Sequence, residues 1–369
     1  MHHKLEAPYR KDSYNKIPHI NDRPSAFWDE MEAQERLRDP LKIGEDPIVG
    51  PEWVPIIPDG QYVLPEEGVH FMIAPHDDTK FLRVEHLEPE QLEPVCRLIL
   101  PFLQGNPARQ VCYNIAPDKS RKTSQSWHNL HMHFLQLPSF ERMAEVERLP
   151  FKMREFAWRM QSSALLELYK TRANIPPSLK TVQLPTCHPM GGIEFVLPDD
   201  LNPKTLAEII KYMDTSYREI HRSIVSLFVS NYDNVYNSNG QVGYESVHRN
   251  QESQIDTFDN LPETKTYLRH LCKFLKFVKD PNTTTQMSPP ENTDTIIRVP
   301  AYTTVFTNIN NKYYLQFMPH LFRDSGGTEV RGIELERKSV DTIPEDGRVD
   351  RADECIKSLM KTVYGNSDS

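Results

Sequence analysis

The chain has few of the residues that mark specialised classes of protein. Its cysteines are an odd number, widely spaced and without a Cys-x-x-Cys pair: Cys96, Cys112, Cys187, Cys272 and Cys355. This spacing supports neither a disulfide framework nor a cysteine-based zinc site. We therefore expect buried free thiols.

Long apolar segments and a basic excess are also lacking. No apolar run approaches the roughly 18–20 residues that a membrane-spanning helix needs, and the charges of residues 1–6 are not followed by the apolar segment of a secretory signal. The net charge of −9 argues against binding to extended nucleic acid, which needs a basic face. A soluble, cytoplasmic protein is expected, and a small phosphorylated ligand held by a few local cations is compatible with this charge.

Glycine is scarce, with 14 residues, whereas proline is abundant, with 30, so fixed turns are expected in preference to flexible connectors. Hydrophobic residues make up 38% of the 369 positions, which is typical of a globular protein with a sizeable core. Helical patterns cover residues 25–38, 89–103, 141–171, 203–227, 264–278 and 351–363. Strand patterns cover residues 70–74, 81–84, 110–115, 127–137, 295–307, 312–322 and 332–336. This mixed order favours an α+β fold with antiparallel sheets and flanking helices.

An internal repeat links two distant segments. Residues 195–210 can be laid over residues 81–96 without a gap, with identities at Phe81/Phe195, Leu87/Leu201, Pro89/Pro203 and Leu92/Leu206. In both segments a strand pattern ends, a Leu-x-Pro turn follows and a helix starts with proline in its first turn. A duplication explains the match, although strand–proline–helix junctions also converge on such residues. A duplication predicts two related half-barrel units that pack together.

Chemistry-bearing residues concentrate around the strand pattern at 127–137. Alternation along a strand would place Asn129, His131 and His133 on one polar face, with Leu130, Met132 and Phe134 toward the core. Neighbouring imidazoles can serve as nucleophile, proton shuttle or metal ligands. They can also belong to a solvated edge or form a satisfied pair in a polar core. The preceding loop offers cations, hydroxyls and an amide, which suit a phosphate: Lys119, Arg121, Lys122, Ser124, Gln125 and Ser126.

These residues resemble the histidine triad superfamily, in particular its galactose-1-phosphate uridylyltransferase-like and nucleotide phosphorylase-like branch. The counterparts of the family pattern are Asn114 on one strand, the turn Ser124-Gln125-Ser126, and the alternating segment from Asn129 to Phe134. The uridylyltransferase-like members contain a duplicated unit, which agrees with the repeat. The resemblance covers residues 62–138 well and residues 191–337 loosely.

The resemblance implies a nucleotidyl transferase, hydrolase or phosphorylase that forms a nucleotidyl-histidine intermediate on a nucleotide or nucleotide-sugar substrate, without a cofactor or metal. His131 takes the position of the nucleophile, and His133 that of the third histidine or glutamine. Gln125 and Ser126 match the turn that binds the phosphoryl oxygens, and Asn114 matches a residue near the ribose and phosphate. We expect Lys119, Arg121, Lys122 and Ser124 to hold further phosphate oxygens.

Two positions depart from the family pattern. Asn129 stands where the first histidine is usual, and Ser124 stands where glycine is usual. A catalytically silent nucleotide- or RNA-binding protein is therefore one alternative. A metal-dependent enzyme with His131 and His133 as ligands is another.

The expected organisation has four parts. An extended arm covers residues 1–60, a catalytic unit covers 61–185, and a second, degenerate unit covers 186–345 with a polar insertion at 230–294. A helix and tail cover residues 346–369. The second unit has no alternating histidines, so we expect one active site per chain, in a monomer or weak dimer.

Overall fold

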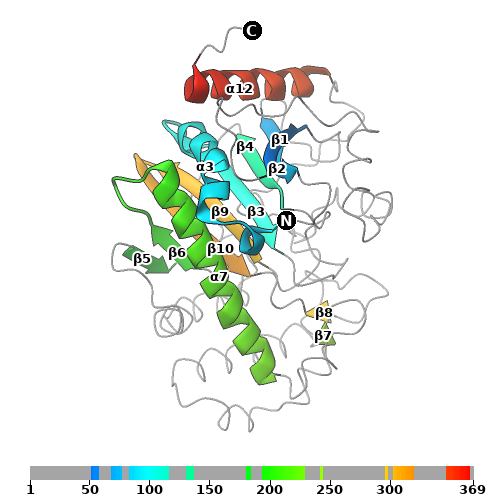
Figure 1. Cartoon of the computed structure of the whole chain (residues 1–369), viewed down its shortest axis with the longest axis vertical. Helices are drawn as coiled ribbons and strands as arrows, with labels where there is room; N and C mark the ends of the chain where they lie inside the picture. Colours follow the sequence, from blue (N-terminus) through cyan, green and yellow to red (C-terminus); the bar gives the residue numbers. More distant parts are fainter. Residues whose placement is uncertain are drawn as a thin grey trace, which may run out of the picture.

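The computed structural model describes residues 51–57, 68–76, 83–115, 130–136, 180–183, 193–228, 242–243, 296–297, 302–319 and 346–365. Within these residues the fold is α+β, as expected, with a large antiparallel sheet and the helices α3 (Pro89–Leu103), α7 (Pro203–Phe228) and α12 (Asp346–Tyr364) (Figure 1). The patterns expected at 25–38, 141–171, 264–278 and 332–336 lie outside the described residues. No helix in the described part of the chain is long and apolar enough to cross a membrane.

Eight strands form the main sheet in the order β1-β2-β4-β3-β9-β10-β6-β5, and every neighbouring pair is antiparallel. The strands are β1 (Glu52–Ile56), β2 (Val69–His76), β3 (Arg109–Ile115), β4 (Met132–Gln136), β5 (Lys180–Gln183), β6 (Ile193–Val196), β9 (Tyr302–Ile309) and β10 (Lys312–Pro319). A separate two-stranded sheet pairs β7 (Val242–Gly243) with β8 (Ile296–Ile297).

A continuous apolar row crosses the centre of the sheet on the face that α3 covers. Strand pairing places one buried residue of each of six neighbouring strands side by side, namely Phe71, Phe134, Val111, Phe306, Leu315 and Phe195. Phe102 of α3 packs edge-on against two of these rings, with centroid distances of 5.7 Å to Phe71 and 5.1 Å to Phe134. Burial of these large side chains supplies much of the driving force that holds the helix on the sheet.

Helix α3 begins and ends where its sequence predicts. Pro89 occupies the first turn, and the backbone N–H of Glu88 donates to Oε1 of Gln91 at 2.9 Å, which satisfies one of the donors at the helix start. Gly105 follows the helix at φ +71, a left-handed conformation that favours glycine. The expected helix boundaries at residues 89 and 103 are confirmed.

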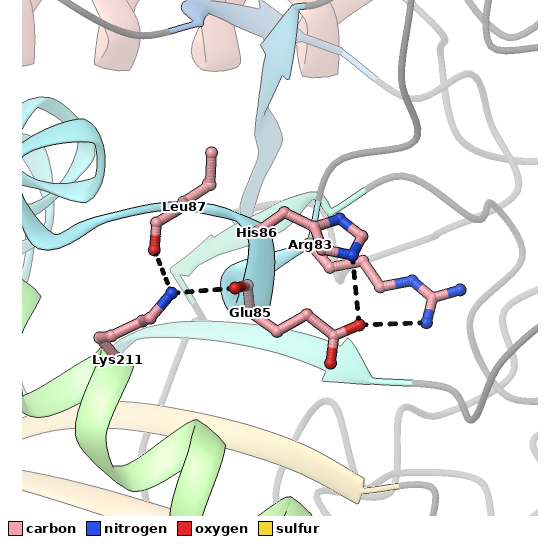
Figure 2. A network of polar contacts seen from close by, with 5 residues as sticks. All are labelled: Arg83, Glu85, His86, Leu87 and Lys211. Atoms are coloured by element: carbon pink, nitrogen blue, oxygen red, sulfur yellow. Dashed lines mark hydrogen bonds and ion pairs between the residues drawn. The ribbon is translucent and has the colours of Figure 1, made fainter.

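A lysine of α7 joins the second half of the chain to the segment before α3. Figure 2 shows the Lys211 ammonium at the end of the short 3-10 helix η1 (Val84–His86), where it donates to the carbonyl oxygens of Glu85 at 2.9 Å and Leu87 at 2.6 Å. The Glu85 carboxylate in turn contacts Arg83 at 3.5 Å and His86 at 3.4 Å. The lysine therefore fixes α7 against the start of the α3 segment.

Strands β9 and β10 are joined by the shortest hairpin connection. Asn310 and Asn311 form the two-residue loop, with φ values of 53 and 61. Left-handed conformations at both loop positions are those of a type I′ turn, whose twist matches that of the flanking strands. Asparagine tolerates this conformation better than other residues with a side chain.

Several sequence expectations need correction. Strand β4 begins at Met132, not at residue 127, because its ladders to β2 and β3 both start there; Leu130 and His131 precede it. The ungapped repeat does not reach the strands, because residues 77–88 separate β2 from α3 whereas only residues 197–202 separate β6 from α7. Strands β3 and β9 join the two halves of the chain into one continuous sheet. Within the segment expected as an arm, residues 52–56 form β1 and pair with β2.

Candidate active site

His133 of β4 and His131, which immediately precedes the strand, lie on the face opposite α3. Side chains alternate along a strand, so Met132 and Phe134 point to the helix side while His131 and His133 point to the other. This face is buried and is not a solvated edge, because only 4% of His131 and 2% of His133 is exposed. Burial makes hydrogen-bond partners for these imidazoles a requirement, since an unmatched polar group away from water is costly.

The ring of His133 is held by a third histidine. Nε2 of His70 lies 3.0 Å from Nδ1 of His133, and the two rings stack with centroids 5.3 Å apart and an interplanar angle of 22°. His70 lies on β2, the strand that pairs with β4. It is diagonal to His133, because the direct partner of His133 on β2 is Met72. One imidazole donates and the other accepts, so the contact fixes the orientation of the His133 ring and couples its tautomer to that of His70.

His131 completes a line of three imidazoles. Its ring packs edge-on against that of His133, with centroids 5.0 Å apart and an interplanar angle of 67°. A neutral imidazole is a competent nucleophile, and a neighbouring imidazole can take or return a proton. The three imidazoles therefore combine a candidate nucleophile, His131, with an oriented neighbour, His133, and both of these residues are almost fully buried.

Strand β3 flanks the histidines on the side away from β2. Cys112 pairs directly with His133, and Asn114 lies two residues further along β3, where it pairs with Thr303 of β9. The backbone of Asn114 is thus beside the start of β4. Its side chain is outside the described residues.

The structure brings together only part of the predicted site. His131 and His133 are close, whereas the remaining predicted residues lie outside the described residues, namely Lys119, Arg121, Lys122, Ser124, Gln125, Ser126 and Asn129. His70 was missed because its contact with His133 spans 63 residues and depends on the β2–β4 pairing. The available signal was a histidine at the start of an apolar strand pattern.

The described residues offer no group of three or more His, Cys, Asp and Glu side chains arranged to hold a metal ion. The alternative in which His131 and His133 bind a metal thus receives no complete ligand set from this part of the chain. Among the described cysteines, Cys96 and Cys112 are buried, as expected, whereas Cys355 is half-buried, and none of the three belongs to a disulfide. Burial, with a smaller contribution from the charge of Glu93, raises the pKa of Cys96 well above its usual value, so this thiol is not an activated nucleophile.

Comparisons with known proteins add one weak structural likeness. No family model matches the chain, and no curated protein matches it. The crystal structure of a DUF4931 family protein from Bacillus cereus ATCC 10987 is similar with a TM-score of 0.32 and 9% sequence identity, over 88% of this chain and 100% of that chain. A TM-score this low does not establish a shared fold.

Proposed function

We propose that the chain is a histidine triad-like nucleotidyl transferase, hydrolase or phosphorylase in which His131 forms a covalent nucleotidyl intermediate. The observation that carries this proposal is the buried contact of His131 with His133, whose ring is held by His70 at 3.0 Å. Such a line of imidazoles, on one face of neighbouring strands, supplies a nucleophile and fixes its neighbour. Its resemblance to the histidine triad pattern gives the reaction class.

The reaction proceeds in two displacements at one phosphorus. The neutral His131 imidazole attacks the α-phosphorus, a nitrogen–phosphorus bond forms, and the bond to the leaving oxygen breaks with its electron pair. An acceptor oxygen, from water, phosphate or a sugar phosphate, then attacks the same phosphorus and restores free His131. Two in-line displacements need no redox partner, and charge stabilisation is their main requirement.

The other predicted residues keep the roles that the resemblance implies. Gln125 and Ser126 contact the phosphoryl oxygens, and Asn114 binds near the ribose. Asn129 stands where a first histidine is usual and keeps His131 oriented. Lys119, Arg121, Lys122 and Ser124 bind phosphates beyond the one attacked. His133 donates to the phosphate or orients His131, and His70 holds His133 in place.

We also propose that the two halves of the sheet are tandem versions of one unit. From its two edges to its centre, the sheet has the strand orders β1-β2-β4-β3 and β5-β6-β10-β9. Along the chain, α3 follows β2 in the first half, and α7 follows β6 in the second half. Strand β3 pairs Cys112 with Val305 of β9, and these residues pair outward with His133 and Gln316. If Cys112 is superposed on Val305, the first residue of β3, Arg109, coincides with the first residue of β9, Tyr302. The last residue of β4, Gln136, then coincides with the last residue of β10, Pro319.

The experiment that tests the proposed reaction is trapping of the intermediate. The full chain would be incubated with nucleoside triphosphates, dinucleotides and nucleotide sugars, and denatured samples would be analysed by mass spectrometry for the mass of a nucleoside monophosphate less water. We expect an acid-labile adduct on the peptide that contains His131, its loss in His131→Ala, and no effect of a chelator. His86→Ala is the matched control, because His86 is an exposed histidine away from the cluster. Turnover that persists in His131→Ala would refute the mechanism.

A further inference from the structure

Polar side chains are buried in the second half of the sheet, on the same face as the histidines. Thr307 of β9 is fully buried, and 3% of Gln316 of β10 is exposed. The opposite face of these two strands carries the apolar residues Phe306 and Leu315, which belong to the row across the sheet. Polar groups are costly at such positions unless they meet a hydrogen-bonding partner.

The Thr307 hydroxyl has no such partner among the described residues. It is buried and makes no hydrogen bond to any of them. Thr307 pairs across the hairpin with Tyr314, and Gln316 lies two residues further along β10, on the same face. The three side chains therefore offer two hydroxyls, an amide and an aromatic ring at one place.

The proposed tandem relationship matches these three residues with residues in the first half of the sheet. When Cys112 is superposed on Val305, Gln316 takes the place of His133, and Tyr314 takes the place of His131. By the same superposition, Thr307 takes the place of Asn114. We call Thr307, Tyr314 and Gln316 the mirror site. Its three side chains are polar, but it has no imidazole that could form a covalent bond.

The loop beside the mirror site also lacks the cations that are expected to bind phosphate in the first half. In the first half, residues 116–131 connect β3 to β4 and include Lys119, Arg121 and Lys122. In the second half, Asn310 and Asn311 alone connect β9 to β10. Threonine, tyrosine and glutamine are uncharged, so they suit hydroxyls and base edges, and a tyrosine ring can stack on a base.

We infer that Thr307, Tyr314 and Gln316 form a second, noncovalent site that binds a nucleoside, the uncharged sugar-and-base portion of a nucleotide. The inference rests on the proposed tandem units. Gln316 and His133 are three strand spacings apart, about 14 Å, so this nucleoside is distinct from the one joined to His131. It belongs either to a second part of the substrate or to a separate molecule, and the chemistry that holds it is the same.

The two threonines of β9 provide a matched test. Thr304 and Thr307 lie on one strand, both are fully buried, and neither hydroxyl bonds to a described residue, but they point to opposite faces. Binding of adenosine, guanosine, cytidine and uridine to the full chain would be measured by saturation-transfer NMR. We expect Thr307→Val and Gln316→Leu each to weaken the binding of at least one nucleoside by about fivefold. We expect Thr304→Val to leave it unchanged.

Three outcomes would overturn the inference: no nucleoside binds the wild-type chain, Thr304→Val weakens binding as much as Thr307→Val, or His131→Asn abolishes binding that Thr307→Val leaves intact. Far-UV circular dichroism of each variant checks folding, and valine nearly preserves the shape of threonine. Adduct formation at His131 is scored separately in Thr307→Val. If the adduct forms normally but nucleoside binding is not selective for the mirror-site residues, the second site alone is refuted. If binding is selective but no adduct forms in any variant, the covalent mechanism alone is refuted.

Discussion

His70 of β2 contacts His133 of the neighbouring strand β4 through ring nitrogens 3.0 Å apart. The stacked imidazoles leave His133 one favoured ring orientation, and His131 packs against that ring. If the proposed reaction is correct, His70 is a positioning residue, because it acts on the substrate only through His133. Its loss should lower the rate of the chemical step more than it changes substrate binding.

We expect His70→Leu to lower kcat by about tenfold, the equivalent of one hydrogen bond realised in the transition state, with little change in KM. His70→Gln should recover part of the loss, because its amide can still bond to Nδ1 of His133. Steady-state kinetics on the substrate identified by adduct trapping would measure both. The control is His86→Leu, which changes an exposed histidine. A fall in thermal stability with unchanged kcat would mean that His70 is only structural.

Cys96 predicts how stability depends on alkaline pH. Its pKa is raised well above the usual value, first by burial and then by Glu93, so the folded thiol stays neutral while the unfolded thiol ionises at about pH 8.5. The unfolded state therefore releases a proton that the folded state keeps. The resulting stability is present below about pH 8.5 and is lost as the pH rises above it.

Urea denaturation of the wild type and of Cys96→Ala, at about pH 7.5 and about pH 9.5, would measure this effect. The wild type should lose up to about 1.4 kcal/mol of unfolding free energy per pH unit more than the variant over the upper part of that range. The variant loses packing energy at both pH values, so only the difference in slope is informative. Equal slopes would show that Cys96 ionises alike in both states.

Residue-level reasoning from the sequence succeeds where a property is local. The histidines of β4 and the alternation of Met132 and Phe134 are visible in one segment, and both were predicted. The burial of His131 and His133, and their contact with His70, depend on strands that lie far apart in sequence. Burial on both faces of the sheet cannot be inferred from alternation, which gives only the side to which each residue points.

At the scale of elements, Lys211 gives α7 a role beyond packing. Its ammonium donates to two carbonyl oxygens at the end of η1, and it lies 3.9 Å from the Glu88 carboxylate. Hydrogen bonds from a charged donor contribute about 1.5–3 kcal/mol each. Lys211 is 22% exposed, so solvent screening reduces this contribution.

We expect Lys211→Met to lower the unfolding free energy by about 2 kcal/mol, because methionine keeps the apolar stem but leaves two carbonyls without their donor. Urea denaturation would measure the change. Lys204→Met is the control on the same helix, because Lys204 is exposed in the first turn of α7. A loss equal to that of the control would mean that water replaces the ammonium without cost.

Element boundaries were predictable where capping or turn chemistry marks them. Pro89 and Gly105 delimit α3, and Pro203 starts α7, as the sequence indicated. The boundary of β4 was not predictable, because it is set by where the ladders to β2 and β3 begin. The expected strand at 295–307 is similarly divided into β8 and β9, which pair with different partners.

At the scale of the whole molecule, the β3–β9 pairing decides the architecture. It joins the first half of the chain to the second through hydrogen bonds between residues almost 200 positions apart, from Gln110 with Thr307 to Ile115 with Tyr302. The α+β class and the similarity of the two helices were predictable from pattern and repeat. The single continuous sheet was not, because strand pairing at this separation leaves no local signal.

This pairing predicts what happens when the second half is removed. A fragment that ends near Arg172 keeps β1, β2, β3, β4 and α3 but leaves the outer edge of β3 without β9. Exposed backbone donors and acceptors on a strand edge, beside the buried side chains Val111 and Tyr113, are a template for pairing with another chain. We expect the fragment to self-associate, with β3 taking the place of β9, because the two strands occupy mirrored positions in the sheet.

Analytical ultracentrifugation of the fragment over a range of concentrations would measure this association. Co-expression with the complementary fragment, residues 173–369, is the control and should give one complex with a single copy of each, because β9 then covers β3. A fragment that stays monomeric and folded at high concentration would show that β9 is not needed to protect the edge, and that the β3–β9 contact is a junction between independent units.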